Sequence, residues 1–163
     1  MWCPYQCPPV EPWDCPERQA VGKTCGGFNT IITVAVNDDH QLLGWHLLAG
    51  NVAKWKGTPK LLEGMRPSVV VAPNDHDNNR FRQILWLRLI QAAIPNHSRR
   101  KRRYPEHSAI KLQRVADSVI ARLKRFRRVG TRYEKTSEGY DAVVALAALW
   151  IALLRDHPEQ TGG

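Results

Sequence analysis

One stretch of the sequence, residues 109–128, is patterned for a helix with two chemically opposite faces. At 100° per residue, its apolar side chains fall in one arc and its charged side chains fall in the other. The apolar arc holds Leu112, Val115, Ala116, Val119, Ile120, Leu123 and Phe126. The polar arc holds Lys111, Arg114, Asp117, Ser118, Arg122, Lys124, Arg125 and Arg128. The pattern predicts a helix that packs on a sheet and exposes a row of cations with one carboxylate among them.

The residues before this helix predict an α/β fold that begins with a β-hairpin. Residues 30–36 are rich in β-branched side chains, residues 37–40 (NDDH) suit a turn, and residues 42–48 suit a second strand. Further along we expect a short helix capped by Thr58, a buried strand over 69–72, a helix capped by Asp77 and a strand over 93–95. Ser108 is expected to cap the two-faced helix, and Thr136 or Ser137 a last helix that reaches Leu154.

Positive charge is concentrated in one half of the chain. The 163 residues carry a formal charge of +9, yet residues 80–135 contain 17 Lys and Arg against three acids. This asymmetry favours a polyanionic partner, with nucleic acid first and an acidic membrane surface a weaker alternative. The longest apolar run, residues 142–154, is shorter than the about 20 residues that span a bilayer. We therefore interpret it as a buried core helix, expect no membrane partner, and predict a cytoplasmic protein.

The ends of the chain differ in composition from the middle. Residues 1–22 contain five prolines and predict a disordered leader, and residues 157–163 predict a flexible tail. Cys3, Cys7, Cys15 and Cys25 all lie near the N-terminus, at wider spacings than most structural zinc sites have. Incidental thiols are the simpler interpretation, and a zinc-stabilised basic nucleic-acid-binding module is the alternative.

Several motifs resemble bacterial insertion-sequence transposases of the DDE type, in that family's order and over about residues 18–154. The motifs are QAVGKTCGGFNTIITVAV (19–36), HLLAGN (46–51), HDNNRFRQIL (76–85), AAIPNHSRRKRRYP (92–105) and RLKRFRRVGTRYEKT (122–136). The resemblance implies an RNase H-like fold, with residues 23–156 as part of the catalytic domain. It also implies binding of DNA and Mg2+-dependent strand cleavage and joining, using two Asp residues and one Glu.

The resemblance places three catalytic positions on this sequence. The first acid belongs to a central strand, but here that region is the Pro-rich leader with Asp14 alone, so we expect this strand to be missing. The second position falls on Pro73, with Asp75 two residues away as a substitute or as a turn residue. The third falls on Asp117, where the family has Glu. The family's neighbouring Tyr, Arg and Lys fall on Ile110, Gln113 and Lys124.

These positions define the predicted site. Asp117 is the candidate catalytic and metal-binding residue, and Asp75 is the second catalytic candidate. The alternative for Asp117 is a surface ion pair with a neighbour such as Arg114, which contributes roughly 0.2–0.5 kcal/mol. The residues predicted to bind DNA are Arg114, Arg122, Lys124, Arg125, Arg128 and Arg132. The prediction is a transposase-type chain that keeps nonspecific DNA binding and has lost the chemistry.

Overall fold

The predicted β-hairpin forms the larger of two sheets in the computed structural model, which describes residues 19–101, 103–105 and 107–156. Strands β2 (Gly27–Val36) and β3 (Leu42–Ala49) pair antiparallel, with Thr30 opposite Ala49 and Val34 opposite Trp45. Backbone hydrogen bonds across residues 37–41 close the expected turn. Strand β1 (Gly22–Thr24) pairs with only the first three residues of β2. The fold begins earlier than the predicted leader boundary, since Ala20 and Val21 are already buried.

A second, separate sheet is a parallel pair. Strands β4 (Val69–Val71) and β5 (Gln91–Ala93) are joined through helix α2 (Asn79–Leu87), which confirms the predicted β-α-β order. Strand β5 lies two residues before the predicted position, because Pro95 has no N–H to donate to a ladder. The predicted cap was also wrong. Asn78 caps α2 by accepting a hydrogen bond from the Arg80 backbone N–H at 2.8 Å, while Asp77 is used elsewhere.

The short elements between the two sheets follow the prediction in position but not in capping. A 3-10 turn, η1 (Lys54–Lys56), leads into helix α1 (Thr58–Leu61), which has proline in its first turn. The hydroxyl of Thr58 does not cap this helix, since its oxygen is buried without a hydrogen-bond partner among the described residues. A second 3-10 turn, η2 (Asn74–His76), follows β4 and carries Asp75.

The two-faced helix forms in three consecutive pieces. A 3-10 segment, η3 (Ser108–Leu112), leads into α3 (Gln113–Arg125), and α4 (Arg127–Gly130) follows a break at Phe126, whose backbone is extended. His107, not Ser108, caps the start by accepting from the Ala109 N–H at 3.1 Å. The last helix, α5 (Ser137–Asp156), begins as predicted, because the Thr136 hydroxyl accepts from the Gly139 N–H at 3.1 Å.

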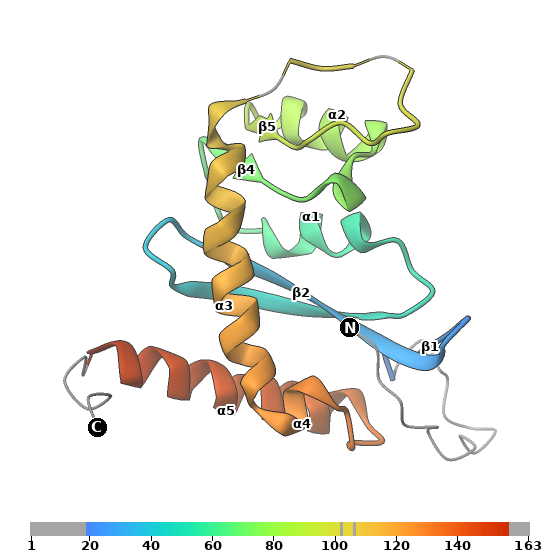
Figure 1. Ribbon diagram of the computed structural model, residues 1–163, viewed down its shortest axis with the longest axis vertical. Helices are drawn as coiled ribbons and strands as arrows, with labels where there is room; N and C mark the ends of the chain where they lie inside the picture. Colours follow the sequence, from blue (N-terminus) through green and yellow to red (C-terminus); the bar gives the residue numbers. More distant parts are fainter. Residues whose placement is uncertain (1–18, 102, 106, 157–163) are drawn as a thin grey trace.

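The apolar interior is divided into two clusters that share no residue. One cluster surrounds α2, β4 and β5 and is made of Leu62, Ala72, Phe81, Leu85, Ile90 and Ile94. The other joins α3, α4 and α5 to the hairpin and is made of Leu123, Val129, Tyr140, Val144, Ala147 and Ile151. Figure 1 shows the continuous η3–α3 segment running past both halves, with η3 beside β4 and β5, and α3 against β2. This segment therefore positions the two halves relative to each other.

Each sheet also has an edge with little or no pairing. Among the described residues, β2 pairs beyond Asn29 with β3 alone, and β4 pairs with β5 alone. The fold is therefore α/β, with a small antiparallel sheet, a parallel pair and several helices, but the two sheets are not joined into one mixed sheet.

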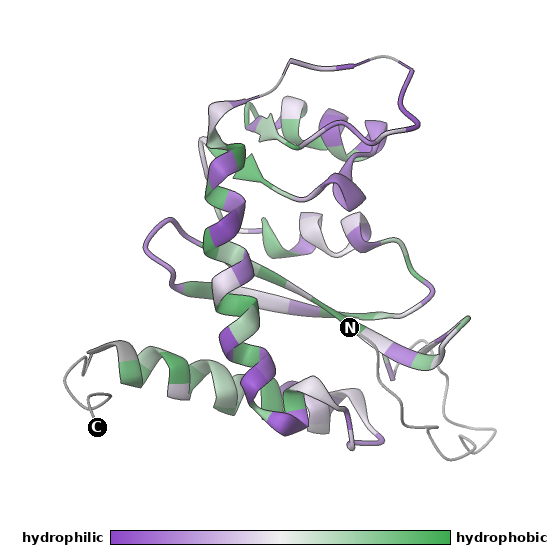
Figure 2. Ribbon diagram, in the orientation of Figure 1, coloured by the Kyte–Doolittle hydropathy of each residue, from purple (hydrophilic) through white to green (hydrophobic). Residues whose placement is uncertain are grey.

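Helix α5 is not the buried core helix that its composition predicts. One face packs on the second cluster, but Leu146, Leu149, Trp150 and Leu153 are exposed. Figure 2 shows apolar residues along most of this helix, and its C-terminal half extends beyond the other elements. Length and composition alone would allow residues 137–154 to cross a bilayer, and 22% of that window is buried in the structure. A core helix of a soluble protein can pass the same test, so this single helix is weak evidence for a membrane.

Candidate nucleic-acid interface

Helix α3 presents the predicted row of cations on one face. Its apolar face is firmly packed, with Val119 fully buried and Leu123 nearly so. Arg114, Lys124 and Arg125 are exposed, as the helical wheel predicts. Two of the predicted cations bond to other residues of the chain: Arg122 is half-buried and donates to the Ile151 carbonyl at 3.5 Å, and the exposed Arg128 pairs with Glu134 at 2.5 Å.

Arg132 does not belong to this exposed row. The residue is 8% exposed, and its guanidinium donates to the carbonyl of Gln19 at 2.9 Å, to the hydroxyl of Thr30 and to the carbonyl of Glu134. It also lies over the ring of Tyr140, with Cζ 5.1 Å from the ring centroid. Arg132 therefore ties the start of the described chain to β2 and α5, and the structure gives it an internal role in place of the predicted phosphate contact.

Asp117 is exposed on the same face of α3 as Arg114, Lys124 and Arg125. Among the described residues it forms no ion pair, so the alternative in which it pairs with Arg114 is not realised. An open cavity of 470 Å³ beside it is lined by Ile110, Lys111, Gln113, Arg114 and Asp117. Of the positions that the family spacing selects, Ile110, Gln113 and Asp117 line this cavity, whereas Lys124 does not. Because η3 and α3 alone supply the lining, the cavity is a surface hollow of that segment.

Asp75 has a different environment from the one expected of a catalytic acid. It lies in η2, directly after β4, and its side chain is 49% exposed. Its carboxylate pairs with the Lys54 ammonium at 2.5 Å, and the hydrogen bond from Lys54 lowers the pKa of Asp75 below its usual value. The structure thus pairs Asp75 with a cation from η1, which fits the turn-residue interpretation better than the catalytic one.

The described carboxylates do not form the metal site that the resemblance implies. Sites that use two metal ions hold them about 3.5–4 Å apart and need several acids close together. Within residues 19–156, apart from the two that are not described, no three His, Cys, Asp or Glu side chains meet where they could hold a metal ion. With Asp117 on an exposed helix face and Asp75 paired with Lys54, the described residues do not fit a Mg2+ centre.

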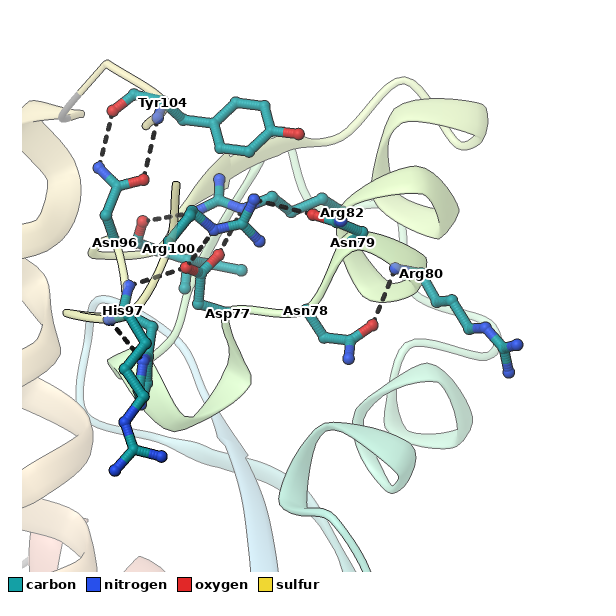
Figure 3. Close-up of polar contacts among 11 residues, drawn as sticks. Asp77, Asn78, Asn79, Arg80, Arg82, Asn96, His97, Arg100 and Tyr104 are labelled. Atoms are coloured by element: carbon teal, nitrogen blue, oxygen red, sulfur yellow. Dashed lines mark hydrogen bonds and ion pairs between the residues drawn. The ribbon is translucent and has the colours of Figure 1, made fainter. Parts of the chain in front are cut away.

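The best-organised polar site lies at Asp77, which the sequence suggested only as a helix cap. Its side chain is 0% exposed and its carboxylate accepts three hydrogen bonds (Figure 3). The donors are Arg82 Nε at 2.8 Å, Arg100 Nε at 2.6 Å and the His97 backbone N–H at 2.8 Å. Burial alone would raise the pKa of Asp77. The hydrogen bonds from Arg100, His97 and Arg82 outweigh it and hold the pKa below its usual value.

The partners of Asp77 fix the segment that follows β5, which we term the basic loop (residues 96–101 and 103–104). The amide of Asn96 donates to the Tyr104 carbonyl at 2.8 Å and accepts from the Tyr104 N–H at 2.9 Å. The guanidinium carbons of Arg82 and Arg100 lie 4.3 Å and 5.0 Å from the centroid of the Tyr104 ring. Asp77 and Arg100 are 23 positions apart. Nothing in local patterning could have predicted their contact.

The N-terminal cysteines can be placed only in part. Cys25 is an exposed free thiol in the turn between β1 and β2. Cys3, Cys7 and Cys15 lie outside the described residues, as do Asp14, most of the predicted leader and the predicted tail.

Comparisons with known proteins do not identify the chain. A scan against protein-family models and searches of curated proteins and of solved structures give no match.

Proposed function

We propose that this chain is a DNA-binding domain of the DDE transposase type that binds the phosphate backbone and does not cut it. The observation that carries the proposal is the exposed row of Arg114, Lys124 and Arg125 on α3. The opposite face of α3 is anchored by Val119 and Leu123, so the helix is held in place and its cations are spaced by helical geometry. Such a row suits contacts with successive phosphates and carries no base specificity.

The order of elements supports an RNase H-like origin for this domain. A hairpin, a parallel pair joined by a helix, and a following helix that carries the third acid position occur in the order that the resemblance implies. The resemblance also implies a central strand that carries the first acid. Both strands have an unpaired edge on one side among the described residues, and the η3–α3 segment contacts both. Loss of that central strand would leave sheet edges without a strand partner.

Binding without cleavage follows from the poor fit of the described residues to a Mg2+ centre. We expect no Mg2+- or Mn2+-dependent nicking of a supercoiled plasmid by the purified protein, because no described acids join Asp117 in the cluster that the chemistry requires. Nicking would be measured by gel electrophoresis with and without EDTA. Metal-dependent nicking that disappears in Asp117→Ala would show that the site is complete and would refute this part of the proposal.

Neutralising the exposed row on α3 tests the DNA-binding part. Replacing Arg114, Lys124 and Arg125 with Gln should weaken binding to duplex DNA and reduce the slope of log K against log salt by about 2.7, at about 0.9 per phosphate contact. Fluorescence anisotropy over a range of NaCl concentrations measures both quantities. A control variant replaces Lys23, Lys56 and Arg66, exposed cations outside α3, with Gln and removes the same charge. Equal losses in the two variants would contradict a localised interface.

The alternative function is a zinc-stabilised basic module that uses the four cysteines. The one described cysteine, Cys25, is exposed and could reach a metal only together with residues outside the described part. Metal analysis of protein purified without chelators separates the two proposals. We expect less than about 0.1 zinc per chain, since the cysteine spacing is unlike that of structural sites. Stoichiometric zinc lost together with the fold on chelation would favour the alternative.

A further inference from the structure

We propose that the basic loop is a second, preformed phosphate-binding surface for duplex DNA and that Asp77 is its positioning residue. The inference rests on the proposed function, because it extends the DNA contact beyond α3. It concerns a different segment, whose exposed cations among the described residues are Arg99, Lys101 and Arg103. Among the described residues none of the three has a carboxylate partner.

The ends of the basic loop are joined to each other. The Asn96 side chain makes two hydrogen bonds to the backbone of Tyr104, eight positions away, through its amide nitrogen and its amide oxygen. Two such bonds fix both the distance and the relative orientation of the ends. The loop is therefore closed before any ligand arrives.

The middle of the basic loop is tied to the protein interior through Asp77. This carboxylate holds the His97 N–H and the Arg100 guanidinium, and Arg100 also donates to the Asn79 side-chain oxygen at 2.8 Å. Arg82 fixes Asp77 from α2 and donates to the Ile94 carbonyl at 2.8 Å. Figure 3 shows these groups converging beneath Tyr104. The arrangement orders a segment that has no regular secondary structure of its own.

The positive charge of the basic loop favours binding of an anionic ligand. Three exposed cations within five residues repel one another, and a free loop would separate them. Here hydrogen bonds at Asn96, His97, Arg100 and Tyr104 hold described residues beside these cations, which limits that relaxation. A duplex backbone presents phosphates at regular intervals and removes the repulsion. Arg side chains also match phosphate oxygens in a bidentate geometry. The basic loop leads directly into η3 and α3, so one continuous segment would carry both contact surfaces (Figure 1).

The Asp77→Asn variant tests whether DNA affinity depends on the position of the basic loop or on net charge alone, because the two explanations predict opposite changes in affinity. The substitution removes a negative charge, so a binding surface defined by net charge alone would bind DNA more tightly. If Asp77 positions the loop, affinity for a 20-base-pair duplex should instead fall by about tenfold, with a shallower dependence on salt. Asp39→Asn is the matched control: it makes the same charge change in the exposed hairpin turn and should not weaken binding.

Two further variants keep the test decisive if Asp77→Asn does not fold. Asn96→Ala opens the closure at Tyr104 with no change in charge and should weaken binding in the same direction. Replacing Arg99, Lys101 and Arg103 together with Gln should lower the salt slope by about 0.9 per residue. Folding of each variant is checked by circular dichroism at the temperature of the binding assay.

The outcomes distinguish this inference from the proposed function. Weaker binding by Asn96→Ala and by the triple variant, with Asp39→Asn unaffected, supports a positioned loop. Wild-type affinity and salt slope in the triple variant, or tighter binding by a folded Asp77→Asn, overturn the inference and leave binding by α3 intact. Failure of the wild-type protein to bind duplex DNA at all overturns both.

Discussion

Replacing Asp77 with Ala is expected to lower the free energy of unfolding by about 3–5 kcal/mol, the range seen when one partner of a buried ion pair is removed. The substitution would leave Arg82 and Arg100, both largely buried, without their shared carboxylate, and would free the His97 N–H. Urea unfolding followed by circular dichroism gives the value. Asp39→Ala, in the exposed hairpin turn, serves as the control and should change stability by no more than about 0.5 kcal/mol.

The effect of Asp77 should depend on pH in a defined direction. Its pKa is lower in the folded protein than in the unfolded chain, where a free Asp titrates near about 3.9. The folded state therefore binds fewer protons at Asp77. The stability that ionised Asp77 contributes is fully present above the pKa that this residue has in the unfolded chain. That stability is lost as the pH falls through the pKa of Asp77 in the folded protein. The difference between wild type and Asp77→Ala should thus be constant near neutrality and shrink below about pH 4. A difference that stays the same at pH 3 would assign the effect to packing.

Phe81→Ala is the second substitution with a large expected effect, lowering the free energy of unfolding by about 3–5 kcal/mol. The Phe81 side chain is 0% exposed at the centre of the cluster around α2, β4 and β5. Because the two clusters share no residue, the loss should be concentrated in one half of the molecule. Amide hydrogen exchange should quicken in α2, β4 and β5 while β2, β3 and the buried face of α5 retain protection.

The neighbouring Trp86 provides the comparison for Phe81. It lies on the same helix but is 74% exposed, so Trp86→Ala should change stability by no more than about 0.5 kcal/mol. If Phe81→Ala instead loosened all strands and helices equally, the two clusters would form one cooperative unit. That result would contradict an independent response of the two halves.

Local patterns predicted the elements whose stability depends on neighbours in sequence. The predictions of strand β2 from its β-branched residues, of the turn at residues 37–40, and of opposite apolar and basic faces on α3 were all correct. In each case the deciding interaction joins residues a few positions apart, or is a simple division between inside and outside. The breaks in the two-faced helix were missed because the extended backbone at Phe126 is not marked by proline or glycine at that position.

Residues whose role depends on distant partners could not be assigned in this way. Arg132 looked like one more surface cation, yet its partners include the Gln19 carbonyl, 113 positions away. Asp77 looked like a helix cap, and its contact with Arg100 depends on the fold of the whole basic loop. On α5, composition suggested full burial, but the structure offers too little surrounding surface to cover Leu146 and Trp150. The local sequence shows whether such a side chain is charged or apolar, but it does not predict which distant residues the side chain will contact.

The candidate site shows the same division. Ile110, Gln113 and Asp117 line one cavity, because they belong to consecutive turns of the η3–α3 segment. Bringing Asp75 to Asp117 would have required agreement between separate elements, and in the structure Asp75 pairs with Lys54. Helical spacing was therefore a good guide within the η3–α3 segment and carried no information across the fold.

The unpaired edge of β2 sets a practical condition on every measurement suggested above. Residues 30–36 are uncharged, rich in β-branched side chains and free of proline, and beyond Asn29 they have β3 as their one strand neighbour among the described residues. An open edge of this composition can template the growth of further strands from other molecules. We therefore expect light scattering to rise with protein concentration and with time.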